Sequence, residues 1–134
     1  MEKLKETMEQ LAILRKAIEA SKSFIDQQPF FIRGFAVQDF TSSTGLSFEE
    51  WLRLIDSVNN ALQAGTPAQQ GDVRKLIDHL ERYAQYAESI PDKIRMAAQF
   101  ASLPKEVMES AEQALQLAQM ARKLKQNLTE LLRE

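Results

Sequence analysis

His79 is the side chain of this sequence best suited to acid–base chemistry near neutral pH, and it is the only histidine. Arg74 stands five residues before it in the stretch "RKLIDH". A carboxylate-bridged di-metal site needs Glu-x-x-His on two helices, and here Leu76 occupies the position of that glutamate. The chain has no cysteine, which excludes disulfides and thiolate metal ligands. We therefore expect no metal site and no cofactor.

The R-x4-H spacing of Arg74 and His79 resembles the R-x4-6-H signature of HEPN-type ribonucleases. The resemblance covers six residues. It departs from the family at Lys75, where a polar residue such as Asn, Asp or His is usual, and the family motif usually lies late in the chain. It implies metal-independent RNA cleavage, in which Arg74 binds the phosphate and His79 moves the proton of the attacking 2′-hydroxyl. The preferred interpretation is that Arg74 and His79 are solvated helix residues, with Asp78 and Glu81 as nearby partners. The ribonuclease is the alternative.

Residues 23 to 51, "SFIDQQPFFIRGFAVQDFTSSTGLSFEEW", contain six of the seven phenylalanines and the only tryptophan. The phenylalanines follow neither a 3.6-residue nor a 2-residue period, so they do not line one regular face. One interpretation is an end plug of the bundle, with a short helix at "PFFIRGFAVQDF", because each buried Phe contributes about 1.5 to 3 kcal/mol. The other is an arm that docks on a partner or a second subunit, since aromatic residues beside Arg33 and Asp39 have the composition of binding hot spots.

The candidate partner-binding residues in this aromatic segment are Phe30, Phe31, Arg33, Phe35 and Phe40. Pro29 and Gly34 bracket "FFIR" and allow it to leave a helical path, so at least one of Phe30, Phe31 and Phe35 is predicted to be exposed. The aromatic residues attached to the flanking helices are predicted to be core: Phe24, Phe48 and Trp51.

The elements around this segment are helices. Leu11, Leu14 and Ile18 recur at helical steps in a first helix of residues 2 to 27, which Pro29 ends. A connection of about 19 residues follows. Ser47 and Glu50 form a capping box that starts the next helix, and Gly65 stops it.

Three more helices are predicted after Gly65. The next begins at Thr66–Pro67 or at Gly71 and ends at a break over residues 89 to 91; a short helix then runs from Pro91 to Phe100. Ser102 and Pro104 precede a last helix of residues 104 to 133, which has near-heptad spacing typical of a coiled coil and Lys125 filling a gap in it. We therefore predict an all-α bundle of four main helices plus one short helix, with long first and last helices.

Length and composition indicate one domain, residues 1–134, with interspersed charges and a net charge of −2, which argues against nucleic acid as the main ligand. The N-terminus lacks the apolar region of a signal peptide and no apolar run spans a membrane, so we expect a cytoplasmic protein. Terminal helices longer than the inner ones leave an apolar overhang that a second copy of the chain would cover, so we predict a homodimer, with pairing of the two long helices within one chain as the alternative. The expected function is a non-catalytic adaptor, assembly, structural or regulatory protein that binds a protein partner or itself through the aromatic segment 24–51 and the long terminal helices.

Overall fold

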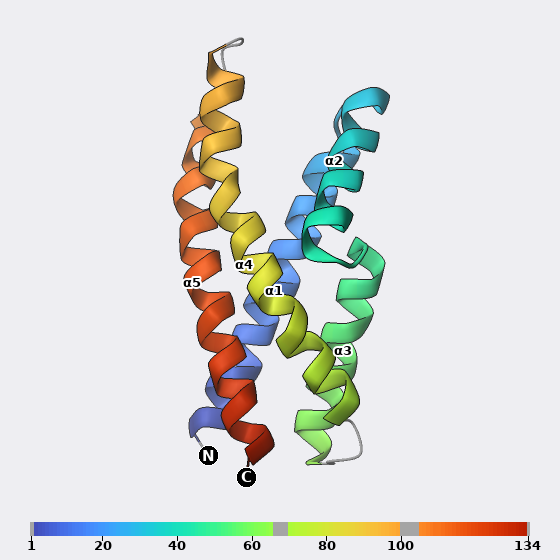
Figure 1. Cartoon of the computed structure of the whole chain (residues 1–134), viewed down its shortest axis with the longest axis vertical. Helices are drawn as coiled ribbons and strands as arrows, with labels where there is room; N and C mark the ends of the chain where they lie inside the picture. The colour runs from blue at the N-terminus through green and yellow to red at the C-terminus, as the bar shows by residue number, and fades with distance from the viewer. Residues whose placement is uncertain (1, 66–69, 100–104, 134) are drawn as a thin grey trace.

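The computed structural model describes residues 2–65, 70–99 and 105–133. Within these ranges the chain forms five helices and no strand: α1 (Glu2–Asp26), α2 (Phe30–Thr44), α3 (Phe48–Ala64), α4 (Gln70–Ala98) and α5 (Lys105–Arg133). In Figure 1, α1 ascends, α2 and α3 descend one after the other, α4 ascends and α5 descends. The fold is therefore an all-α bundle, as predicted, with four legs of which the second is broken into two helices.

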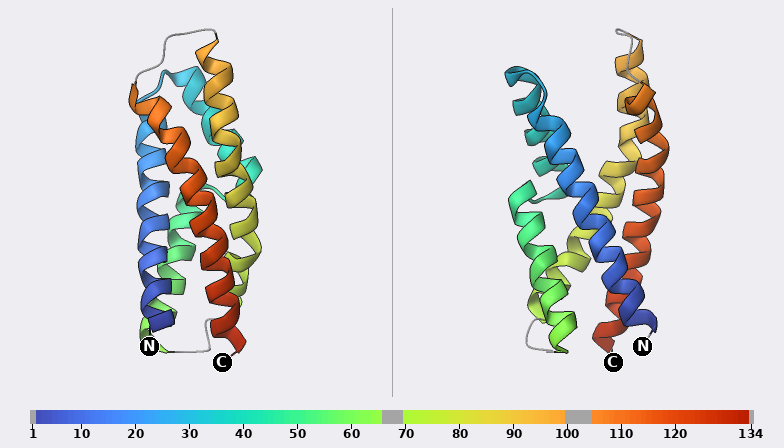
Figure 2. Two further views of the ribbon diagram at one scale, coloured as in Figure 1. Left: turned by 90° about the vertical axis from the view of Figure 1, so that its left-hand side faces the viewer. Right: turned by 180° about the vertical axis from the view of Figure 1, so that it is seen from behind.

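The division of the chain into helices differs from the prediction in two places. The expected connection after the first helix is mostly the 15-residue helix α2. The expected break at residues 89 to 91, and with it a separate short helix to Phe100, is wrong, because α4 continues through Pro91 for 29 residues. Pro91 removes one backbone hydrogen bond without ending the helix. The described side chains from Ser89 to Gln99 are exposed or half-buried, and the end of α4 lies apart from the start of α5 in the left view of Figure 2. Lys93 of this stretch pairs with Asp39 of α2, a contact between helices that the continuation of α4 makes possible. The predicted signals Thr66–Pro67 and Ser102–Pro104 lie outside the described residues.

The prediction that the first and last helices are longer than the inner ones, on which the expected dimer was based, is also wrong. α4 and α5 each contain 29 residues, and α2 and α3 together make a leg comparable in length to α1. The bundle therefore has no long overhang of its terminal helices. Any self-association needs a different surface.

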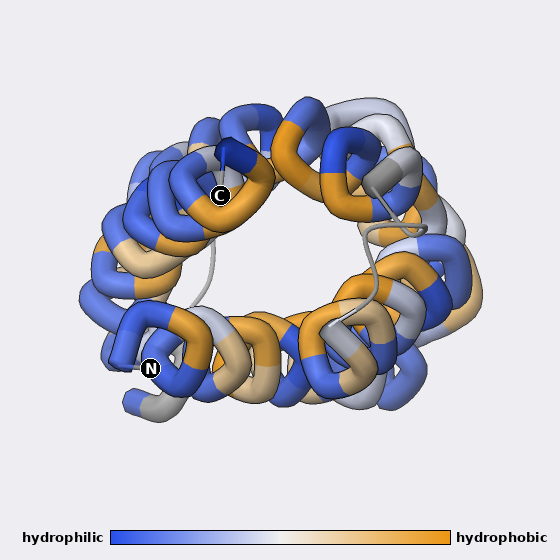
Figure 3. The backbone as a smooth tube through the Cα atoms, turned by 90° about the horizontal axis from the view of Figure 1, so that it is seen from below, coloured by the Kyte–Doolittle hydropathy of each residue, from blue (hydrophilic) through white to orange (hydrophobic). Residues whose placement is uncertain are grey.

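The core lies along the axis between the four legs, where the apolar sides of the helices face inward (Figure 3). The predicted capping box of α3 is present, with Ser47 Oγ accepting from the Glu50 backbone N–H at 3.1 Å, and Gly65 ends the helix at φ 64°. In α5 the gap in the heptad spacing is filled by Leu124, which is fully buried, rather than by Lys125. The local signals therefore predicted both ends of α3, and the register of α5 less well.

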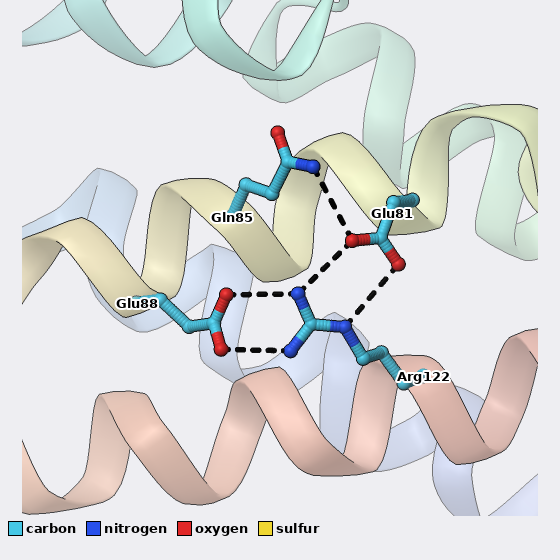
Figure 4. A network of polar contacts seen from close by, with 4 residues as sticks. All are labelled: Glu81, Gln85, Glu88 and Arg122. Carbon is cyan, nitrogen blue, oxygen red and sulfur yellow. Dashed lines mark hydrogen bonds and ion pairs between the residues drawn. The ribbon is translucent and has the colours of Figure 1, made fainter.

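A network of charges clamps α5 to α4 on the bundle surface (Figure 4). The Arg122 guanidinium of α5 donates to Glu81 at 2.9 and 3.2 Å and to Glu88 at 2.7 and 2.8 Å, both on α4. Gln85 donates to the Glu81 carboxylate at 3.3 Å. The hydrogen bonds from Arg122 lower the pKa of Glu81 and of Glu88 below the ordinary value of 4.5. The network therefore stabilises the fold only while both carboxylates are ionised.

We expect the stability of the protein to fall as the pH drops below about 4.5. Both glutamates have a lower pKa folded than unfolded, so their contribution is complete above the unfolded value and is lost as the pH falls through the folded one. Urea midpoints between about pH 6 and pH 3 should show a weaker acid dependence in Arg122→Gln than in the wild type. Arg95→Gln, which removes an exposed pair with Asp92, is the control. An Arg122→Gln curve parallel to that of the wild type would contradict this role.

An exposed aromatic surface on α2 as candidate binding site

One side of α2 is anchored in the core through Phe40. The Phe40 ring stacks on Phe48 of α3 at 3.9 Å between centroids and meets Tyr86 of α4 edge-on at 5.2 Å. Next to it, Asp39 pairs with Lys93 of α4 at 2.6 Å. α2 is therefore held against both α3 and α4 by side chains of its own second half.

The C-terminus of α2 is fixed as firmly as its side. Arg82 of α4 donates to the carbonyl oxygens of Ser42 and Ser43 at 2.7 and 3.2 Å, which satisfies two carbonyls that a helix end leaves unpaired. Gly45 follows in the left-handed region at φ 90°, and a Cβ there would lie 2.5 Å from Arg82 Nη1. The Trp51 indole N–H donates to Thr44 Oγ1 at 2.9 Å inside the core. These contacts fix the direction in which the rest of α2 points.

The first half of α2 presents phenylalanines to solvent. Phe30 is 81% exposed, and Phe31 and Phe35 are each 75% exposed. At about 100° per residue, Phe31 and Phe35 lie about 140 to 180° around the helix from Phe40, on the side facing away from the bundle. Phe24, 52% exposed, lies in the last turn of α1, three residues before the turn that leads into α2. We call Phe24, Phe30, Phe31 and Phe35 the aromatic surface.

The two charged residues of α2 are both engaged within the chain. Arg33 donates to the backbone carbonyl of Asp26 at 3.4 Å, and its guanidinium carbon lies 6.0 Å from the centroid of the Phe30 ring. Asp39 accepts from Lys93 and from the Ser43 hydroxyl. Asp39 is thus paired with a cation, whereas Arg33 contacts a neutral carbonyl and an aromatic ring, so the outer side of α2 offers apolar contact area beside one positive charge.

The structure divides the predicted site residues into two groups. The prediction that at least one of Phe30, Phe31 and Phe35 is exposed is confirmed, since all three are, and an end plug made of them is wrong. Phe40 is 1% exposed, so its assignment to partner binding is wrong. Phe24 was predicted to be core and is half exposed.

The two errors within α2 share one cause. α2 carries apolar residues on both sides, so its sequence shows no periodicity from which the inner side is recognised. The signal that was available is the spacing of Ala36, Phe40 and Thr44 at steps of four, which marks the inner side once a helix is assumed.

The two side chains of the ribonuclease resemblance do not converge. Five residues apart on α4, Arg74 and His79 point about 140° apart around the helix. Arg74 is exposed, whereas His79 is half-buried with Nδ1 2.8 Å from the Lys75 carbonyl oxygen and its ring edge-on to Trp51. This geometry holds the imidazole as a packing group and does not pair it with Arg74.

Other candidate sites in the described part of the chain are weaker. No group of three or more His, Asp or Glu side chains there is placed to hold a metal ion. A shallow groove between α1 and α3 lies towards the opposite end of the bundle from the start of α2, and its lining residues are Leu4, Lys5, Met8, Glu9, Ala12, Asn59 and Gln63. It lacks a histidine and combines one cation with one anion on an open surface.

Among the described residues, no helix combines the length and the apolar character that crossing a membrane requires. The aromatic surface contains the three most exposed phenylalanines of the described chain. No family model, curated protein or solved structure matches this chain.

Proposed function

We propose that this chain is a non-catalytic protein-interaction module that binds a protein through the aromatic surface formed by Phe24, Phe30, Phe31 and Phe35. The observation that carries the proposal is the exposure of three phenylalanines, at 75 to 81%, on a helix anchored at its other side and at its end. An anchored helix does not turn these rings inward without breaking the Phe40 and Arg82 contacts. Their burial therefore requires another molecule.

The contact area that the aromatic surface offers is of the size used in recognition. At about 150 to 250 Å² for each Phe, exposed fractions of 52 to 81% correspond to about 400 to 700 Å² on one chain. The largest apolar patch on an ordinary monomer is about 300 to 600 Å² and is often functional. Aromatic side chains are also the usual anchors of protein interfaces, because they bury much area with few rotatable bonds.

The charges around the surface favour a protein over a membrane or a nucleic acid. Residues 24 to 40 contain no lysine, and their one arginine, Arg33, is already engaged within the chain. Amphipathic helices that lie on membranes carry lysines and arginines along the polar face. Single-stranded nucleic acids need cations for the phosphates beside the aromatic platform. A protein partner with an apolar surface requires no such cations and is compatible with the exposed phenylalanines.

The test is a photoreactive phenylalanine analogue placed at position 35 and irradiated in cells that express the protein. We expect a covalent adduct that is reduced at least about tenfold by Phe31→Ser in the same chain, because both rings belong to one contact surface. The matched control carries the analogue at Leu115, which is 46% exposed on α5. Thermal unfolding should show both chains equally folded. An adduct that forms equally from positions 35 and 115, or that survives Phe31→Ser, would contradict the proposal.

A further inference from the structure

Gly34 has no explanation within the chain. It lies in the middle of α2 with helical geometry rather than positive φ, and a Cβ there would meet nothing within 4 Å. Glycine destabilises a helix interior relative to alanine because it loses more backbone entropy on folding. Gly34 therefore lowers the stability of α2, and neither a turn nor a close contact within the chain requires a glycine there.

The position of Gly34 connects it to the aromatic surface. Phe30, Phe31, Gly34 and Phe35 are adjacent on a helix, at i, i+1, i+4 and i+5. The absent side chain leaves a notch between exposed rings, and notches of this kind receive a side chain from a closely packed second helix. The glycine at position 34 is independent of the exposure of the phenylalanines. A notch of this kind indicates that the partner at the aromatic surface is a helix.

We propose that this occupant is α2 of a second copy of the chain, related by a two-fold axis, so that a phenylalanine of each copy fills the notch over Gly34 of the other. The inference rests on the proposed function and names its partner. A two-fold interface brings the same surface together twice and so must be self-complementary. The α2 surface meets this condition, because it has both rings and a notch and because Arg33 and Asp39 are engaged within their own chain.

The contact area that the exposed phenylalanines offer is compatible with a dimer of two chains. The three exposed phenylalanines of α2 bury about 700 to 1,200 Å² when both copies are counted. The flanking side chain of Val37, about 60° around the helix from Gly34 and 37% exposed, adds to this. Specific interfaces bury about 1,200 to 2,000 Å² in total, so the pair lies at the lower end of that range. We therefore expect a reversible dimer with a dissociation constant of about 1 to 100 μM.

The test is sedimentation of the full chain over about 1 to 200 μM, with Gly34→Leu as the diagnostic variant. Filling the notch should weaken self-association at least about tenfold while the thermal midpoint of the diluted monomer stays the same or rises, since leucine is the better helix former. The matched control is Gly71→Leu in the first turn of α4, where a Cβ also meets nothing within 4 Å. It should leave association unchanged. Phe31→Ser should abolish association.

A wild-type chain that stays monomeric at about 200 μM would overturn the two-fold pairing. So would a dimer that is insensitive to both Gly34→Leu and Phe31→Ser, because its contact would lie elsewhere. The crosslink from position 35 separates this result from a failure of the proposed function. An adduct with the mass of two chains supports the pairing, and an adduct of any other mass overturns it and retains the interaction module. The absence of an adduct counts against both.

Discussion

Replacing Phe40 with Ala is expected to lower the free energy of unfolding by about 3 to 5 kcal/mol, whereas the same replacement at Phe31 should change it by no more than about 0.5 kcal/mol. Both residues belong to α2, but Phe40 is 1% exposed between Phe48 and Tyr86, and Phe31 is 75% exposed. Truncation at position 40 leaves a cavity between the rings of Phe48 and Tyr86. Truncation at position 31 removes a ring that the single chain does not cover.

The measurement is urea unfolding of both variants at a concentration low enough for the chain to be monomeric. At higher concentration Phe31→Ala should lose stability relative to the wild type, because an interface contributes through mass action and a core does not. A loss above about 3 kcal/mol for Phe31→Ala in the monomer would show that α2 is turned the other way, and the proposed binding surface would then be buried.

Replacing Trp51 with Ala is expected to cost about 3 to 5 kcal/mol and to leave the chain partly unfolded near physiological temperature. Trp51 is fully buried where α2, α3 and α4 meet, and its ring lies 5.6 Å from Tyr83 and 6.2 Å from His79. Its N–H also donates to Thr44, so the indole joins the end of α2 to the core. Removing it empties the junction that sets the direction of α2.

Trp51→Phe is the informative companion. It keeps a ring in the core but removes the donor to Thr44, so we expect a smaller loss of about 1 to 3 kcal/mol. Thermal unfolding followed by circular dichroism measures both variants. A Trp51→Ala chain that loses less than about 2 kcal/mol would mean that the junction repacks around the gap, and the anchoring of α2 would then depend on Phe40 and Arg82 alone.

The sequence by itself determined the features that depend on residues a few positions apart. The capping box of Ser47 and Glu50, the stop at Gly65 and the inner sides of α1 and α3 follow from hydrogen bonds and side-chain periodicity within single turns of helix. The all-α class follows from the same local preferences summed over the chain. Exposure of phenylalanines in "FFIRGF" was also predicted, because Pro29 and Gly34 interrupt the pattern there, although the structure shows that this stretch stays helical.

Only the tertiary structure decided which side of α2 is covered. Phe31 and Phe40 are chemically identical, and the choice between them is made by Tyr86, Lys93 and Arg82, which lie about 40 to 50 residues further along the chain. The local signals at Ser89 and Pro91 also failed to predict the path of α4, which continues as a helix and places Lys93 against Asp39 of α2. A helix with apolar residues all round has no preferred side of its own. The energy that selects one comes from the helices packed against it, and the side that remains exposed is the one we propose as the binding surface.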